Sequence, residues 1–300
     1  MAKRAMAATV GAMVVLGQVL LGGAPAGAAE ASGGLLASGY DTTQRLDPVT
    51  GQALGVVGAG QDATVSRSGR LAYVRDVDPC HPDVEGCFGA NDLLVTARDG
   101  TRERVLVHNT NAQGGVSWPD WSPDGRWITY YWGTPGERGL NIVNVDGTGN
   151  DQLVQVGGPG TFSPDGRSIA YVKDGDVAVI DLETRESRAV TTDGLAQFSP
   201  PDWSPDGRTI VYAGQSEFLT VPAAGGPSTH AGIWPNALSG VFAPVFAPNG
   251  RKVAFTATEA SSDPDLPGTR RVFTARVDGA RLRAVADLDA ELTDWLRGHG

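Results

Sequence analysis

The segment WPDWSPDGRWITYYW, residues 118–132, decides the fold. Ser122-Pro123-Asp124-Gly125 has the composition of a tight turn, because Pro presets φ at the second position and Gly accepts the positive φ that ends the turn. Apolar and polar side chains alternate after it, which is a strand pattern. The segment therefore predicts a strand, a tight turn and a second strand.

This segment recurs along the chain. Its turn glycines are Gly69, Gly125, Gly166, Gly207 and Gly250. Three of the four spacings are 41–43 residues, a period typical of propeller blades with four short strands. Turn residues such as Asp99-Gly100, Asp146-Gly147 and Asp278-Gly279 follow and predict a second hairpin. Each repeat therefore predicts one blade, with strands A to D in chain order.

The two ends of the chain supply a sixth blade. Residues 35–57 have the pattern of strands B, C and D without an A, and residues 291–298 have that of an A strand alone. Joining them would close the ring and remove its free edges. The predicted fold class is all-β: a six-bladed β-propeller of four-stranded blades, closed by N-terminal B-C-D strands with a C-terminal A strand. Residues 30–300 then form one propeller domain.

Residues 1–29 predict a signal peptide that is cleaved. Lys3 and Arg4 precede an apolar run, and Ala26-Gly27-Ala28 offers a cleavage site. A membrane anchor is the alternative, but the run is short for a bilayer span and Gln18 interrupts it. We expect a mature protein with no membrane span, secreted to the extracellular space or the cell envelope, and periplasmic where the source has an outer membrane.

Two cysteines, Cys80 and Cys87, lie in CHPDVEGC. Export to an oxidising compartment favours a disulfide between them. Free thiols and a metal site that also uses His81 are the alternatives, but adjacent Cys and His rarely reach one ion.

Composition argues against two functional classes. The net charge is −10, so nucleic acid is not an expected partner, since phosphate binding needs a basic surface. A G-x-S-x-G nucleophile elbow is missing from the sequence, and its 4 histidines lack the spacing of metal ligands. We predict no catalytic residues. The alternative is a hydrolase or lyase whose metal-assisted site is assembled across blades at the channel mouth.

The repeats WSPDG, FSPDG and FAPNG, each followed by a basic residue and an apolar-aromatic alternation, resemble the WD40-like (PD40) repeats of TolB-type propellers. The resemblance covers nearly all of the mature chain and departs from the pattern at Ser66-Arg67-Ser68-Gly69, which lacks Pro and Asp. It implies a secreted, ring-shaped scaffold of the kind that commonly binds peptides or proteins.

Asp-Trp precedes the turn position in alternate blades, at Asp120, Asp202 and Asp294. In a six-bladed ring these aspartates are related by three-fold pseudo-symmetry. One interpretation is that each carboxylate accepts backbone N–H bonds from an adjacent loop and stabilises blade packing. The other is a divalent-cation site or a clamp for a basic peptide at the channel, because clustered carboxylates favour a positive guest. We expect no resident cofactor unless this cation site exists.

Long B-to-C insertions at 75–90, 131–139 and 258–270 share one face with the D-to-A connections. Loops on a rigid scaffold often bind ligands. Four aromatic residues flank these connections: Trp118, Tyr131, Trp132 and Trp234. They would suit a binding surface if exposed, or would otherwise fill gaps between blades. We predict a monomeric, non-catalytic scaffold that binds a protein or peptide through this face and the central channel. An extracellular structural protein without a small ligand is a further alternative.

Overall fold

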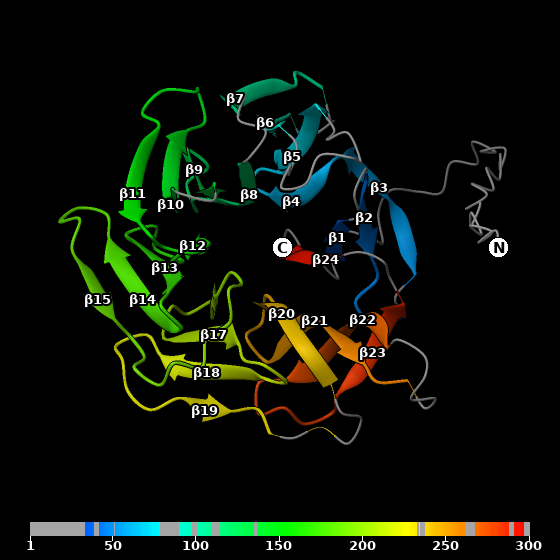
Figure 1. Cartoon of the computed structure of the whole chain (residues 1–300). Helices are drawn as coiled ribbons and strands as arrows, with labels where there is room; N and C mark the ends of the chain where they lie inside the picture. Colours follow the sequence, from blue (N-terminus) through cyan, green and yellow to red (C-terminus); the bar gives the residue numbers. More distant parts are fainter. Residues whose placement is uncertain are drawn as a thin grey trace, which may run out of the picture.

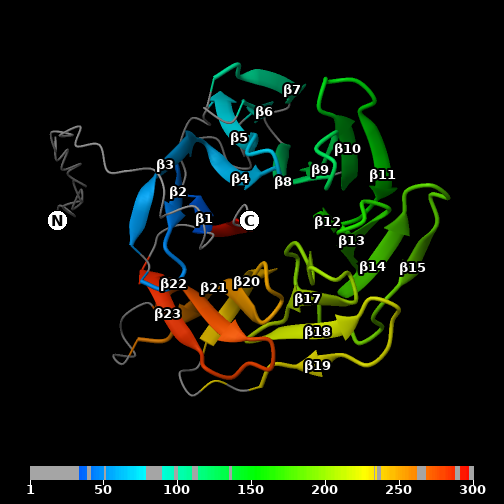
Figure 2. The same cartoon turned by 180° about the vertical axis from the view of Figure 1, so that it is seen from behind.

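The computed structural model is a closed ring of β-sheets (Figures 1 and 2). It describes residues 34–38, 42–50, 52–78, 90–97, 101–109, 114–134, 137–232, 234, 238–261, 268–287 and 291–296. Within these residues all regular structure is β, in six four-stranded antiparallel sheets. The predicted six-bladed propeller is confirmed.

Each blade runs outward from strand A to strand D. Blade 1 contains β4 (Gln61–Val65), β5 (Leu71–Asp78), β6 (Ala90–Val95) and β7 (Arg104–His108). Blade 2 contains β8 (Gly115–Trp121), β9 (Trp127–Gly133), β10 (Arg138–Asn144) and β11 (Asp151–Gln155). Blade 3 contains β12 (Gly160–Phe162), β13 (Ser168–Lys173), β14 (Asp176–Asp181) and β15 (Ser187–Ala189). Blade 4 contains β16 (Asp202–Trp203), β17 (Thr209–Ala213), β18 (Phe218–Pro222) and β19 (Thr229–His230). Blade 5 contains β20 (Leu238–Phe246), β21 (Lys252–Glu259), β22 (Thr269–Arg276) and β23 (Arg283–Asp287).

Blade 6 joins the two ends of the described chain. Its strand order is β24 (Glu291–Leu296), β1 (Gly34–Ser38), β2 (Thr42–Leu46) and β3 (Ala53–Ala59). Leu35 pairs with Trp295 and Leu36 with Asp294, and Figure 1 shows the red β24 beside the blue β1. The predicted closure, three N-terminal strands with one C-terminal strand, is therefore confirmed.

The Ser-Pro-Asp-Gly turns between strands A and B are built alike. In blade 2, the Ser122 hydroxyl donates to Asp124 Oδ1 at 2.6 Å and accepts the Trp127 N–H at 2.9 Å. Gly125 has φ +68° and donates its N–H to the Ser122 carbonyl. Residues 163–168 and 204–209 repeat the two hydroxyl bonds. The sequence repeat therefore encodes a local hydrogen-bond unit as well as a strand reversal.

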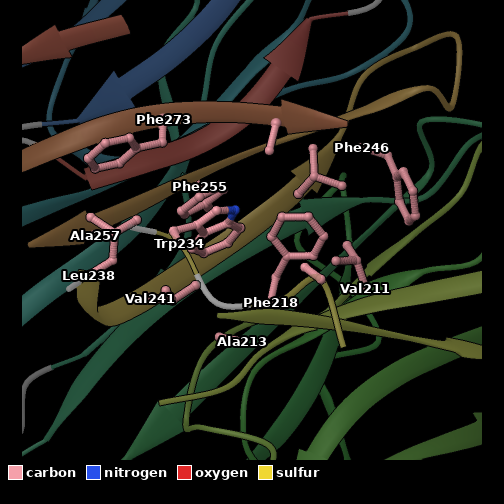
Figure 3. Close-up of a cluster of buried hydrophobic side chains, with 13 residues drawn as sticks. Val211, Ala213, Phe218, Trp234, Leu238, Val241, Phe246, Phe255, Ala257 and Phe273 are labelled. Atoms are coloured by element: carbon pink, nitrogen blue, oxygen red, sulfur yellow. The ribbon is translucent and has the colours of Figure 1, made fainter. Parts of the chain in front are cut away.

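The core lies between the blades. Figure 3 shows the cluster shared by blades 4 and 5, where Phe218 and Phe255 meet with ring centroids 5.5 Å apart. Because every blade is covered on both faces, its inner strands are buried in runs: Ile128, Thr129 and Tyr130 are all buried. The apolar alternation predicted after each turn is thus replaced by burial of both faces.

The insertion at 131–139 is not the long loop that the sequence predicted. Tyr131, Trp132 and Gly133 extend β9, while Arg138 and Gly139 begin β10. Trp132 pairs with Gly139 across the hairpin. The added residues therefore lengthen two paired strands.

The predicted signal peptide, residues 79–89 with Cys80, His81 and Cys87, and residues 262–267 lie outside the described residues. Among the residues that the structure does describe, none forms a helix long and apolar enough to cross a membrane.

Candidate binding face

The Asp-Trp aspartates bind the blade that follows their own. Asp120 of blade 2 accepts the Phe162 N–H of blade 3 at 2.7 Å, and Asp202 of blade 4 accepts the Phe246 N–H of blade 5 at 2.7 Å. Asp294 of blade 6 lies 3.4 Å from the Val65 N–H of blade 1. Each carboxylate therefore accepts a strand A N–H of the next blade. This is the arrangement expected if these aspartates stabilise the packing of neighbouring blades.

In blade 3, which has Thr161 in place of the aspartate, other groups make the interblade contact. The Thr161 hydroxyl of blade 3 donates to the Pro201 carbonyl of blade 4 at 2.8 Å. Trp203 Nε1 returns a hydrogen bond to the Thr161 carbonyl at 3.1 Å. Asp120 and Thr161 therefore join successive blades through different hydrogen bonds.

No three His, Cys, Asp or Glu side chains in the described part of the chain lie close enough together to hold a metal ion. The divalent-cation site stays a prediction, and Asp120, Asp202 and Asp294 are the residues that would form it. A rise in melting temperature with Ca²⁺ that disappears in Asp120→Asn would support it, because a ligand stabilises only the state that binds it.

An aromatic cluster crosses the channel. We define it as Trp118 of β8, Tyr131 of β9, Phe198 in the 190–201 connection and Phe242 of β20. The Trp118 ring centroid lies 5.7 Å from that of Tyr131, 5.8 Å from Phe198 and 5.9 Å from Phe242. Blades 2 and 5 stand opposite each other in a six-bladed ring (Figure 2). Contact between Trp118 and Phe242 therefore places the cluster at the centre of the ring.

A bulge in β8 puts Trp118 in its place. Its φ is +49°, a left-handed conformation that is a genuine outlier for a bulky residue. Register with β9 shifts between Ser117 and Asp120, which leaves Trp118 outside the ladder and redirects its side chain. The freed Trp118 N–H donates to Asp62 Oδ2 of blade 1 at 3.1 Å. Such strain is common at functional sites, where surrounding structure holds it.

The same bulge occurs on the opposite side of the ring. Ala243 of β20 has φ +46° where the register shifts between Phe242 and Val245. Its N–H donates to the Ser199 hydroxyl at 2.7 Å. Ser199 is fully buried and immediately follows Phe198, so this bond ties the 190–201 connection to blade 5 and fixes one ring of the cluster beside another.

Exposure within the cluster is uneven. Phe198 is 44% exposed, and Leu195 of the same connection is 39% exposed. Trp118, Tyr131 and Phe242 are half-buried. Burial raises the pKa of the Tyr131 phenol, an effect that nearby Arg138 opposes, so the hydroxyl is protonated at neutral pH. The cluster presents an apolar surface with one hydroxyl.

The structure separates the four aromatic residues that the sequence grouped together. Trp118 and Tyr131 meet in the cluster. Trp132 lies further out on the blade 2 face that contacts blade 1. Trp234 is 7% exposed, stacks on Phe255 at 5.1 Å, and donates through Nε1 to the Gly279 carbonyl. The prediction that Trp234 is an exposed binding residue is therefore wrong, and it fills a gap between blades (Figure 3).

The sequence analysis did not identify Phe198 or Phe242 as candidate binding residues. Both precede a proline by two residues, and Trp118 precedes Pro119 directly. An aromatic residue followed closely by Pro, three to five residues before the repeat aromatic, is the signal that could have found all three.

Comparisons with known proteins agree with the propeller fold. No family model matches the chain. The Tol-Pal system protein TolB of Francisella tularensis subsp. mediasiatica is 26% identical over 133 residues, a match that covers 41% of this chain and 29% of that protein. The TolB of strain SCHU S4 matches equally well over 28% of its length. The chain thus spans less than a third of these relatives.

Solved structures extend the likeness to most of the ring. A putative TolB from Agrobacterium tumefaciens superposes with a TM-score of 0.58 and 20% identity, covering 80% of this chain and 86% of that one. TolB from Acinetobacter baumannii superposes with a TM-score of 0.58 and 16% identity, and the match covers 85% of this chain and 68% of that one. The chain is a six-bladed β-propeller that is similar to TolB. This TolB-like propeller also matches a chain of the nidogen/laminin complex (TM-score 0.63, 9% identity, 87% and 97% covered), a likeness of fold alone.

Proposed function

We propose that the TolB-like propeller is a non-catalytic scaffold that binds a protein or peptide through the face on which the aromatic cluster lies. The observation that carries the proposal is the meeting of Trp118, Tyr131, Phe198 and Phe242 at the centre of the ring, with Phe198 and Leu195 exposed beside it. Clustered aromatic residues that expose apolar surface are typical of sites that bind other proteins.

The chemistry of the partner follows from charge and shape. The net charge of −10 favours association with a basic surface, since complementary charge raises the rate of encounter. An apolar side chain of the partner would rest against Phe198 and Leu195. We infer an apolar anchor flanked by Lys or Arg, on a peptide or an exposed protein segment.

A peptide selection tests this function. Residues 30–300 would be immobilised and used to select binders from a random peptide library displayed on phage, and the affinity of each selected peptide would be measured by fluorescence polarisation. Phe198→Ser should weaken binding at least about 10-fold, as expected for an anchor contact worth about 1.4 kcal/mol or more. Val105→Ser is the matched control, because Val105 is 42% exposed on the outer strand β7.

Two results would contradict the proposal. One is a set of selected peptides that bind the Phe198 and Val105 variants equally well. The other is the absence of any peptide that binds more tightly to the wild type than to the Phe198 variant.

We also propose that the protein is exported as a monomer, with residues 1–29 removed and Cys80 joined to Cys87. The support is the sequence pattern, together with two relatives named as Tol-Pal system proteins. Fractionation followed by mass spectrometry would find an N-terminus near Ala29 or Glu30. Without reduction, the two cysteines would resist alkylation.

A further inference from the structure

A second site lies at the outer part of the ring, between blades 1 and 2, which are neighbours in Figures 1 and 2. It is a pocket of about 240 Å³. Blade 2 supplies Tyr130, Trp132, Asn141, Asn150, Asp151 and Gln152, and blade 1 supplies Val107. The pocket is separate from the aromatic cluster, because none of its lining residues belongs to that cluster.

Strand register explains how the pocket forms. Tyr130 pairs with Asn141, and Asn141 pairs with Gln152, so these three side chains form a row on one face of the blade. Trp132 pairs with Gly139, which places no side chain beside the indole. A Cβ at Gly139 would lie 2.7 Å from Gln152 Nε2 and 2.3 Å from the Val154 carbonyl oxygen. Glycine is therefore needed at position 139, because the Val154 backbone and the Gln152 side-chain amide leave no room for a Cβ there.

The polar lining keeps unused hydrogen-bonding capacity. Tyr130 donates its hydroxyl to Asn150 Oδ1 at 2.5 Å, and Asn141 Nδ2 donates to the Gly139 carbonyl at 3.0 Å. These bonds fix both carboxamides. Asn141 Oδ1, Asn150 Nδ2 and the Gln152 amide bond to no other described residue. The pocket thus offers both donors and acceptors on side chains that are already oriented.

We propose that this pocket binds one ring of a neutral saccharide. The C–H face of a sugar ring suits the electron-rich face of Trp132, while each sugar hydroxyl both donates and accepts, as the carboxamides do. The volume is below the roughly 300–1,000 Å³ of pockets that enclose drug-sized ligands, which favours a single ring. This ligand and location go beyond the peptide-binding function proposed for the ring centre.

The overall charge of the protein disfavours acidic sugars. Asp151 is the pocket's carboxylate, and Arg185 lies 3.3 Å from it in an exposed ion pair. The charges of this pair sum to zero, and the protein as a whole is acidic, with a net charge of −10. A uronic acid would therefore meet net repulsion, whereas an uncharged sugar would not.

Saturation-transfer NMR on residues 30–300 tests the proposal, with glucose, galactose, mannose and N-acetylglucosamine as probes and glucuronic and galacturonic acids as the charged comparison. We expect transfer to at least one neutral sugar, strongest at its ring C–H protons. Gln152→Ala should weaken the affinity at least 10-fold. Gln155→Ala is the matched control, since Gln155 lies on the same strand and does not line the pocket.

A third variant, Trp132→Leu, should abolish transfer to the ring protons, and its melting temperature would show whether it is folded. The proposal is overturned if no neutral sugar binds, if only the uronic acids bind, or if Gln152→Ala and Gln155→Ala bind the sugar equally well.

Discussion

At the scale of single residues, substitutions of Asp202 can test whether its carboxylate stabilises blade packing or binds a cation. Its Oδ2 accepts the N–H of Phe246, a residue that is 6% exposed, at 2.7 Å. Asp202→Ala would leave that N–H without its partner, which costs about 2 kcal/mol for a hydrogen bond to a charged group. Asp202→Asn keeps an acceptor oxygen and should lose less. Urea denaturation with Ca²⁺ and with EDTA would measure both.

The control for overall charge is Glu183→Ala, which removes one negative charge from an exposed turn. If the three Asp-Trp aspartates formed a cation site, removing one carboxylate would relieve repulsion and stabilise the protein in EDTA. An Asp202→Asn variant more stable than wild type in EDTA would therefore contradict the capping role.

Residue types alone did not decide which aromatic residues are exposed. Trp118 lies within strand A of blade 2, and Trp234 lies just before strand A of blade 5. A bulge with φ +49° directs Trp118 to the channel, whereas Trp234 packs on Phe255. A bulge depends on pairing with the neighbouring strand, and that pairing is not visible in the local sequence.

At the scale of the element, the repeated turns make stability depend on pH. The Ser163 hydroxyl and the Arg167 N–H hold the pKa of Asp165 below its ordinary value of 3.8. Ser204 and the Arg208 N–H lower the pKa of Asp206 in the same way. Because the pKa of each aspartate is lower in the folded state than in the unfolded state, the ionised carboxylate stabilises the folded protein. This stabilisation is complete when the pH is above the pKa in the unfolded state, and it is lost as the pH falls through the pKa in the folded state. Stability should therefore decline below about pH 4.

The fifth turn shows how to test this dependence. It has Asn249 in place of Asp, and Asn249 Oδ1 accepts the Arg251 N–H at 3.0 Å. The double variant Asp165→Asn with Asp206→Asn copies that neutral turn. Its free energy of unfolding should be lower than wild type at pH 7 and should fall less between pH 5 and pH 2.5. Parallel curves for the two proteins would refute a role for these carboxylates in the acid response.

At the scale of the whole molecule, the sequence predicted the ring but not its centre. Five similar turns, with three of their four spacings at 41–43 residues, and two complementary ends predict six blades, because each unit repeats the same local chemistry. The aromatic cluster joins Trp118 to Phe242, 124 positions further along the chain. Blades 2 and 5 lie on opposite sides of the channel only because the ring closes. The local repeat pattern therefore does not reveal which aromatic residues will be in contact at the centre.

Closure itself rests on β24. Leu292 is 1% exposed, and its N–H donates to Thr256 of blade 5 at 3.0 Å. Deleting residues 291–300 would expose the edge of β1 and the buried Leu35 and Leu36. Two leucine side chains exposed in this way cost roughly 3–6 kcal/mol. We expect a melting temperature lower by at least about 5 °C, measured by circular dichroism.

A circular permutant distinguishes the effect of removing strand β24 from the effect of moving the chain ends out of blade 6. Trp295 pairs with Leu35 as Phe162 pairs with Ile169, so residues 163–168 can serve as the turn that joins Trp295 directly to Leu35. New termini at Gly60 would then cut the connection between blades 6 and 1. Because every strand of blade 6 is retained and becomes continuous, the permutant should melt near the wild type while the deletion melts well below it. A deletion variant as stable as the permutant would show that β24 does not hold the ring closed.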